Sequence, residues 1–246
     1  MHRSVIISYL PTAINRRRAA GLIQGQKPTE CYTRSVTDFQ THREEIVNAL
    51  THGIGVVLSI GGGAVLIALA AIHAGAREVV SVSIFVGSLI LLYTASTLYH
   101  AARHPETKQR LKTLDHCAIF LLIAGTYTPF TIAAMQGPWG WSLFGVIWGL
   151  ALLGIVFKLF FTGRFKVLST ATYVGMGWLV VIAFVPLAQA VTTTALIWLI
   201  VGGVLYTAGT VFYHNHRIPH SHGIWHLFVL AGSISHFAAV TAQIVG

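Results

Sequence analysis

The sequence predicts an all-α integral membrane protein, a bundle of seven transmembrane helices. Its composition is the first reason: of 246 residues, 54% are hydrophobic and only 9% are charged, whereas a soluble domain carries about 25% charged residues. The mean hydropathy is +0.70. The second reason is that long apolar runs follow one another from Ile46 to the carboxyl terminus. The third is that basic residues gather in alternate connections between these runs.

Seven apolar runs are long enough to cross a bilayer, which takes about 20 residues as a helix. They lie at 46–72, 79–100, 113–134, 141–161, 168–189, 193–213 and 222–244. Residues 1–42 are polar and basic, and their apolar piece Val5–Leu10 is too short for a signal peptide. We therefore expect two parts: a flexible cytoplasmic tail over 1–42 and a seven-helix domain over 43–246.

The distribution of basic residues predicts the orientation of the helices. Of the 16 Lys and Arg residues, only Arg77 falls on the side of the 1–2, 3–4 and 5–6 connections. The side rich in basic residues is cytoplasmic by the positive-inside rule, so we expect the amino terminus inside and the carboxyl terminus outside. The protein is expected in the cell (plasma or inner) membrane as a multi-pass protein. The net charge of +9 is then a topology signal, and nucleic acid is not an expected partner.

Polar side chains mark the predicted cytoplasmic ends of spans 1, 2, 3 and 7. These ends read "EEIVNALTH", "STLYH", "LDHC" and "SHGIWH". The residues concerned are Glu45, Asn48, His52, Ser96, His100, Asp115, His222 and His226. They come from distant parts of the chain, yet the topology places them at one depth. Ionisable groups inside a membrane are costly and mark functional sites by default, so we expect a site here.

The spacing of two histidines points to a metal ion. His222 and His226 are four residues apart and share one face of a helix. A third histidine from a facing helix would complete three nitrogen ligands and leave the fourth position to water, as in catalytic zinc sites. Zinc brings the pKa of such a water to about 7, and Asp115 could accept its proton or hold it in place.

Simpler interpretations exist for each of these residues. Histidines at a membrane interface commonly reach toward water, Ser96 could bond to a carbonyl of its own helix, and Asp115 could pair with a basic loop residue. His220 is six residues from His226 and lies on another face. His236 lies about 15 Å deeper than His226 at 1.5 Å per residue, so we expect a buried, hydrogen-bonded histidine there.

The chain resembles the hemolysin III branch of the progestin and adipoQ receptor family, which is related to alkaline ceramidases. The matching stretches are "EEIVNALTHGIG", "STLYHAARH", "LDHCAIFLLIAGTYTPF", "FKVLSTATYVGMGW" and "IPHSHGIWHLFVLAGSISHF", which span about residues 43–246. The resemblance implies Zn²⁺ held by His100, His222 and His226. It also implies that Asp115 contacts the metal-bound water with Ser96 beside it, and that Glu45, Asn48 and His52 support the site.

Several functions are compatible with these observations. The first is a zinc-dependent hydrolase that acts on a lipid amide or ester at the cytoplasmic side, as the ceramidase kinship suggests, with Asp115 as general base. The second is a non-catalytic regulator of the membrane, or a receptor-like protein, with structural zinc. A pore-forming hemolysin is disfavoured because no amphipathic insertion segment is evident, and a transporter is the remaining alternative. In the first two, the expected partner is a membrane lipid, as substrate or ligand.

Overall fold

The computed structural model describes residues 41–215 and 217–246. The predicted seven-span membrane protein is confirmed, because the described residues form seven helices long and apolar enough to cross a membrane. The predicted flexible tail lies, except for its last two residues, outside the described part. The spans are α3 (His42–His73), α4 (Ala76–Ala101), α5 (Pro105–Thr128) with η1 (Pro129–Met135), α6 (Gly137–Phe161), α7 (Lys166–Trp178) with η2 (Leu179–Ala183) and α8 (Phe184–Ala190), α9 (Thr193–His214) and α10 (Ser221–Val245).

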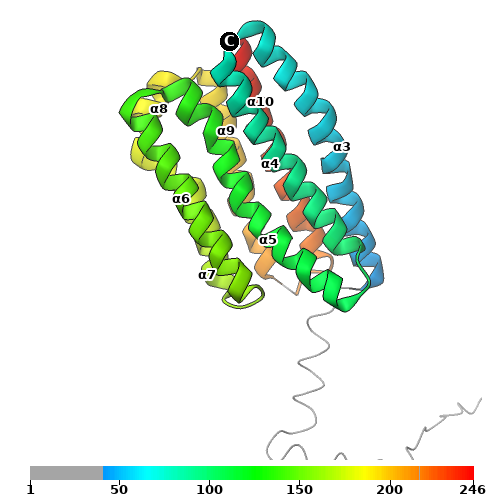
Figure 1. The fold of residues 1–246 in the computed structure, drawn as a ribbon. Helices are drawn as coiled ribbons and strands as arrows, with labels where there is room; N and C mark the ends of the chain where they lie inside the picture. Colours follow the sequence, from blue (N-terminus) through cyan, green and yellow to red (C-terminus); the bar gives the residue numbers. More distant parts are fainter. Residues whose placement is uncertain (1–40, 216) are drawn as a thin grey trace, which may run out of the picture. The chain divides into compact units, whose positions relative to one another are not determined.

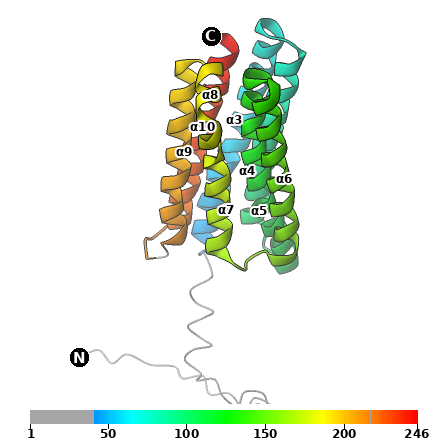
Figure 2. The same cartoon turned by 90° about the vertical axis from the view of Figure 1, so that its left-hand side faces the viewer.

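The helices lie side by side in a bundle (Figures 1 and 2). α3 packs on α4, α4 on α5 and α5 on α6, while α10 packs along α9 and α3, and side chains of α10 also meet those of α4. The start of α3 and the carboxyl terminus lie at opposite ends of the bundle (Figure 1). Helices run up and down in turn, so the start of α3, the end of α4 and the starts of α5 and α10 share one end. Every polar site residue expected from the sequence lies on these four helices.

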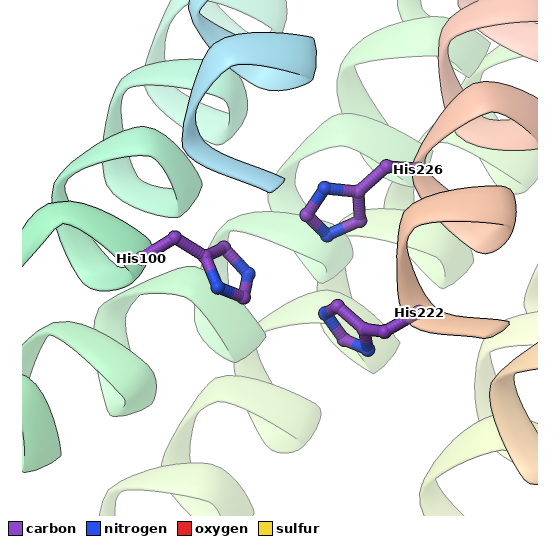
Figure 3. Close-up of side chains that lie close together, drawn as sticks. All are labelled: His100, His222 and His226. Carbon is purple, nitrogen blue, oxygen red and sulfur yellow. The ribbon is translucent and has the colours of Figure 1, made fainter. Parts of the chain in front are cut away.

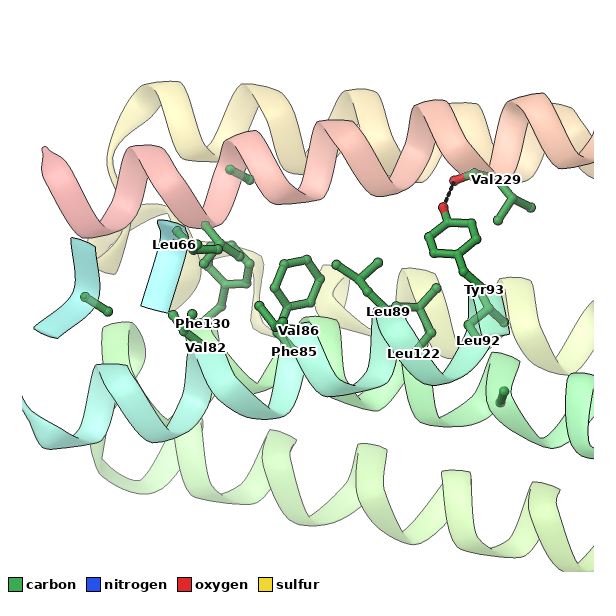
Figure 4. Packing of buried hydrophobic residues seen from close by; sticks show 14 of the residues in the cluster. Leu66, Val82, Phe85, Val86, Leu89, Leu92, Tyr93, Leu122, Phe130 and Val229 are labelled. Atoms are coloured by element: carbon green, nitrogen blue, oxygen red, sulfur yellow. Dashed lines mark hydrogen bonds between the residues drawn. The ribbon is translucent and has the colours of Figure 1, made fainter. Parts of the chain in front are cut away.

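Large apolar side chains cover much of the outer surface, as expected of a protein that sits in lipid. Phe160, Ile72 and Val167 are each more than 70% exposed. In addition to this apolar outer surface, the protein has a buried hydrophobic core on α4 and its neighbours. Its members include Phe85, Val86, Leu89 and Leu122 (Figure 4). A helix forms the hydrogen bonds of its backbone internally. Side chains that face the lipid and side chains that face the bundle interior can therefore both be apolar at membrane depth.

Two spans depart from a regular α-helix, and a proline lies in each. Pro129 has no N–H to bond the carbonyl of Gly125, and its ring crowds that carbonyl. From Pro129 to Met135 the third span continues as a π-helix. The fifth span was expected as one run over 168–189, but residues Leu179–Ala183 are 3₁₀-helical, followed by Pro186, which cannot bond the carbonyl of Ile182.

A tyrosine from α5 compensates the break in the fifth span. The Tyr127 hydroxyl lies 2.9 Å from the carbonyl oxygen of Met176 and 2.8 Å from that of Gly177. The backbone N–H of Val180 donates to the same hydroxyl oxygen at 3.0 Å. One side chain thus bonds main-chain groups at both ends of the irregular turn.

Candidate metal centre

Three histidines converge at the end of the bundle where α3 begins. His100 comes from the last turn of α4, and His222 and His226 come from the first turns of α10. One ring nitrogen from each lies within 4.8 Å of the other two. Figure 3 shows the three rings turned toward a common point between the two helices. We call these residues the histidine triad.

The triad has the donors that a zinc ion requires. His100 and His226 are only 3% and 2% exposed. Within the described part of the chain, Nε2 of His100 and Nδ1 of His226 are buried and have no hydrogen-bond partner. A buried polar atom without a partner is costly, and a neutral imidazole nitrogen is a common zinc ligand. The triad therefore fits a metal ion by geometry, by burial and by the chemistry of its atoms.

Glu45 orients one member of the triad from α3. Its Oε2 lies 2.8 Å from Nδ1 of His100, and its Oε1 lies 3.0 Å from Nζ of Lys108. A carboxylate can only accept, so His100 donates its Nδ1–H and presents Nε2 as a lone pair. Nε2 is the nitrogen of His100 that has no protein partner.

Ser96 and Asp115 form the polar group next to the triad. Ser96 lies one turn before His100 on α4 and is 1% exposed. Its hydroxyl shares a side-chain hydrogen bond with Asp115 of α5, whose side chain is 16% exposed. Asp115 is thus tied to the turn of α4 that precedes His100.

Asn48 and His52 pack against the triad from α3. The ring of His52 stacks on that of His226, with centroids 3.6 Å apart and planes 11° apart. The ring of Tyr93 lies nearly perpendicular to that of His52, with centroids 5.1 Å apart. Asn48 is 1% exposed and reaches the first turn of α10 because Gly223 has no side chain: a Cβ there would lie 3.2 Å from Asn48 Oδ1. α3 thus carries three residues that contact the triad or its helices.

Two other histidines lie apart from the triad. The side chain of His220 is 61% exposed and its Nδ1 is 3.7 Å from Oε1 of Glu44. His236 lies deeper in the bundle, where its Nε2 is 3.3 Å from the carbonyl oxygen of Leu199. The ring of His236 packs against Gly202, where a Cβ would come within 2.3 Å of it.

Sequence reasoning missed the partner of Glu45. From the sequence, Lys108 falls in the predicted connection between the second and third spans, together with several other basic residues, and there it served only to indicate topology. No spacing rule singles it out, because it lies 63 positions from Glu45 in the numbering and on another helix. Its role becomes visible only where α3, α4 and α5 meet.

The fold and the site together define a seven-helix membrane protein with buried histidines from two helices gathered at one end. The chain belongs to the haemolysin-III-related family, whose model matches residues 39–237. It is 47% identical over 212 residues to hemolysin-3 of Bacillus cereus, covering 86% of this chain and 95% of that protein. It is 50% identical over 200 residues to a hemolysin-3 homolog of Bacillus subtilis, covering 81% and 94%.

A more distant relative connects the chain to the wider progestin and adipoQ receptor family. The human monocyte to macrophage differentiation factor is 28% identical over 205 residues, covering 80% of this chain and 83% of that protein. The resemblance expected from the sequence motifs is therefore confirmed. No solved structure gives a significant match.

Proposed function

We propose that this protein is a zinc-dependent hydrolase that cleaves a lipid amide or ester at the end of the bundle that holds the histidine triad. The observation that carries the proposal is the convergence of three imidazole nitrogens from α4 and α10 within 4.8 Å, beside the bonded pair Ser96 and Asp115. Three histidines match the ligand set of known catalytic zinc sites. The kinship with alkaline ceramidases, implied by the sequence motifs, supports a lipid amide as the substrate class.

Each residue has a definite task in this reaction. His100, His222 and His226 would hold the zinc ion, which when bound polarises a carbonyl and makes a nearby water more acidic. The Asp115 carboxylate takes a proton from the attacking water and passes it to the leaving amine or alkoxide. Ser96 donates its hydroxyl hydrogen to Asp115 and so holds the carboxylate in place. One water is consumed, and a fatty acid and an amine or alcohol are released.

A second function is favoured by the way the helices pack. Side chains already connect α4 to α10, among them Tyr93, whose hydroxyl lies 2.7 Å from the Ser233 hydroxyl, and the triad lies between these two helices. An ion held there would join α4 to α10 whether or not a reaction follows. Zinc would then be structural, and the protein would be a regulator of the membrane or a receptor-like protein. The position of the site on the cytoplasmic side rests on the basic residues and is part of the proposal.

The change Asp115→Asn distinguishes the two functions. Asparagine keeps the size of the side chain but cannot take a proton. Purified wild-type and variant protein would be assayed for zinc content and for hydrolysis of a panel of N-acyl lipids and lipid esters. If the protein is a hydrolase, Asp115→Asn should keep its zinc and lose about 10²-fold or more in turnover, the scale of a general base.

Glu106→Gln is the matched control, since it makes the same change at an exposed position in the first turn of α5. It should leave zinc and turnover unchanged. Loss of zinc together with turnover in Asp115→Asn would mean that Asp115 is a ligand or a structural residue, against this mechanism. Zinc without hydrolysis in the wild type, and an unchanged effect of Asp115→Asn on complementation of a deletion strain, would favour the regulator.

A further inference from the structure

Glu45 is held between partners from two other helices at the edge of the histidine triad. Its Oε2 meets Nδ1 of His100 from α4 at 2.8 Å, and its Oε1 meets Nζ of Lys108 from α5 at 3.0 Å. The side chain of His100 is fully buried, and those of Glu45 and Lys108 are 17% and 28% exposed. The pair thus lies at the boundary between the buried triad and the surface.

Lys108 is held as firmly as Glu45. Besides Glu45, its ammonium group donates to the carbonyl oxygens of Tyr99 at 3.1 Å and Ala102 at 3.4 Å. These carbonyls lie at the end of α4, where a helix has no N–H groups of its own to offer them. The ammonium also lies 4.7 Å from the centre of the Tyr99 ring. Its three N–H groups therefore have three acceptors, which fixes the point where the Glu45 carboxylate is anchored.

The carboxylate decides which nitrogen of His100 carries the hydrogen. A neutral imidazole has one N–H, and the bond to Glu45 places it on Nδ1. The other tautomer would put the hydrogen on Nε2, where it would block coordination. Carboxylates that bond to metal-ligating histidines in this way set the ring orientation and raise ligand basicity.

We propose that Glu45 and Lys108 are positioning residues that preset the tautomer and orientation of His100 for the metal ion, and that Lys108 affects the metal only through Glu45. This proposal deepens the proposed function and rests on the zinc site that it assumes. It gives Glu45, in the stretch "EEIVNALTH" of α3, a specific task. It also connects metal affinity to Lys108 near the start of α5, which bonds the carbonyls at the end of α4.

Zinc affinity tests the proposal without reference to activity. The full chain would be stripped of metal in detergent and titrated with zinc against a chromophoric chelator. Glu45→Gln should weaken binding by about 10- to 100-fold, the usual effect of removing such a partner. Lys108→Met should weaken it by a smaller factor, because the Glu45 carboxylate remains but loses its anchor. Glu44→Gln and Arg110→Met, which alter neighbouring charges on the same helices, should bind zinc like the wild type.

The double variant provides the sharpest outcome. If Lys108 acts only through Glu45, adding Lys108→Met to Glu45→Gln should weaken zinc binding no further. Cobalt(II) provides a second readout, because the visible absorption of the four-coordinate ion should fall in Glu45→Gln at equal cobalt occupancy. The unfolding temperature of the metal-free proteins shows whether a variant has a general folding defect. Such a defect would weaken zinc binding in the double variant further than in Glu45→Gln alone.

Three results would overturn the proposal. The first is wild-type zinc affinity in Glu45→Gln, and the second is additive losses in the double variant. The third is a metal-free Lys108→Met protein whose loss of stability alone accounts for its weaker binding. A wild-type protein that binds no zinc would instead refute the proposed function itself, so the wild-type titration separates that failure from the other three.

Discussion

Removing the hydroxyl of Tyr127 should destabilise the protein far more than the loss of one ordinary hydrogen bond. The hydroxyl lies within 2.9 Å of the carbonyl oxygens of Met176 and Gly177, and it accepts the N–H of Val180. It has a single hydrogen, which serves one of the two carbonyls at a time, and a single oxygen, which serves the N–H. The carbonyl of Met176 also accepts the N–H of Leu179, so the groups that lose a partner in Tyr127→Phe are the N–H of Val180 and the carbonyl of Gly177.

The expected magnitude follows from these two groups. A buried donor or acceptor left unpaired costs about 1–3 kcal/mol, so Tyr127→Phe should lower the free energy of unfolding by about 2–6 kcal/mol. Tyr173→Phe is the matched control, because its hydroxyl donates to one carbonyl only, that of His116, at 3.2 Å. Single interhelical hydrogen bonds in membrane proteins contribute about 0.6 kcal/mol on average, and the carbonyl of His116 lies within a regular helix.

Equilibrium unfolding in mixed micelles with increasing SDS, followed by far-ultraviolet circular dichroism, measures both variants against the wild type. The helix content before unfolding shows whether η2 and α8 persist. A loss of stability in Tyr127→Phe no greater than in Tyr173→Phe would refute the reasoning, because it would show that the irregular turn satisfies its main-chain groups without the tyrosine.

Two further predictions concern topology and metal content. Single cysteines labelled in intact cells should react at Gln136, between the third and fourth spans, and be protected at Gln109, near the start of α5; the reverse pattern would contradict an inside amino terminus. The purified protein should bind about one zinc per chain, and alanine at any one member of the histidine triad should remove most of it, because two imidazoles bind zinc poorly. His220→Ala and His236→Ala, which change histidines apart from the triad, should keep the metal, whereas full zinc retention after loss of His100 would reject the ligand set.

The helix content and number of spans were predictable because they depend on local properties of the chain. A continuous run of about 20 apolar residues has the length to cross the bilayer as a helix, which pairs its backbone groups within the run. The predicted run 193–213 and the helix Thr193–His214 agree closely for this reason. The break in the fifth span was not predicted: Pro186 hinted at it, but the compensating hydroxyl of Tyr127 comes from another helix.

The same distinction between local sequence and contacts with other helices applies to the candidate site. The sequence alone determined that His222 and His226 share a helix face, since spacing on one helix is local. It also placed Ser96, His100 and Asp115 at the same depth, because alternate spans reverse direction. Depth does not decide which side chains meet, since that depends on the rotation of each helix about its axis and on how closely the helices pack.

Only the tertiary structure decided those contacts. It brings a nitrogen of His100 within 4.8 Å of nitrogens from residues more than 120 positions later, and it places Glu45 between His100 and Lys108. It also lets α10 approach Asn48, because Gly223 presents no side chain there. These contacts depend on how small and large side chains pack between two helix surfaces. Hydropathy and residue spacing describe each helix separately, so they do not predict which surfaces meet.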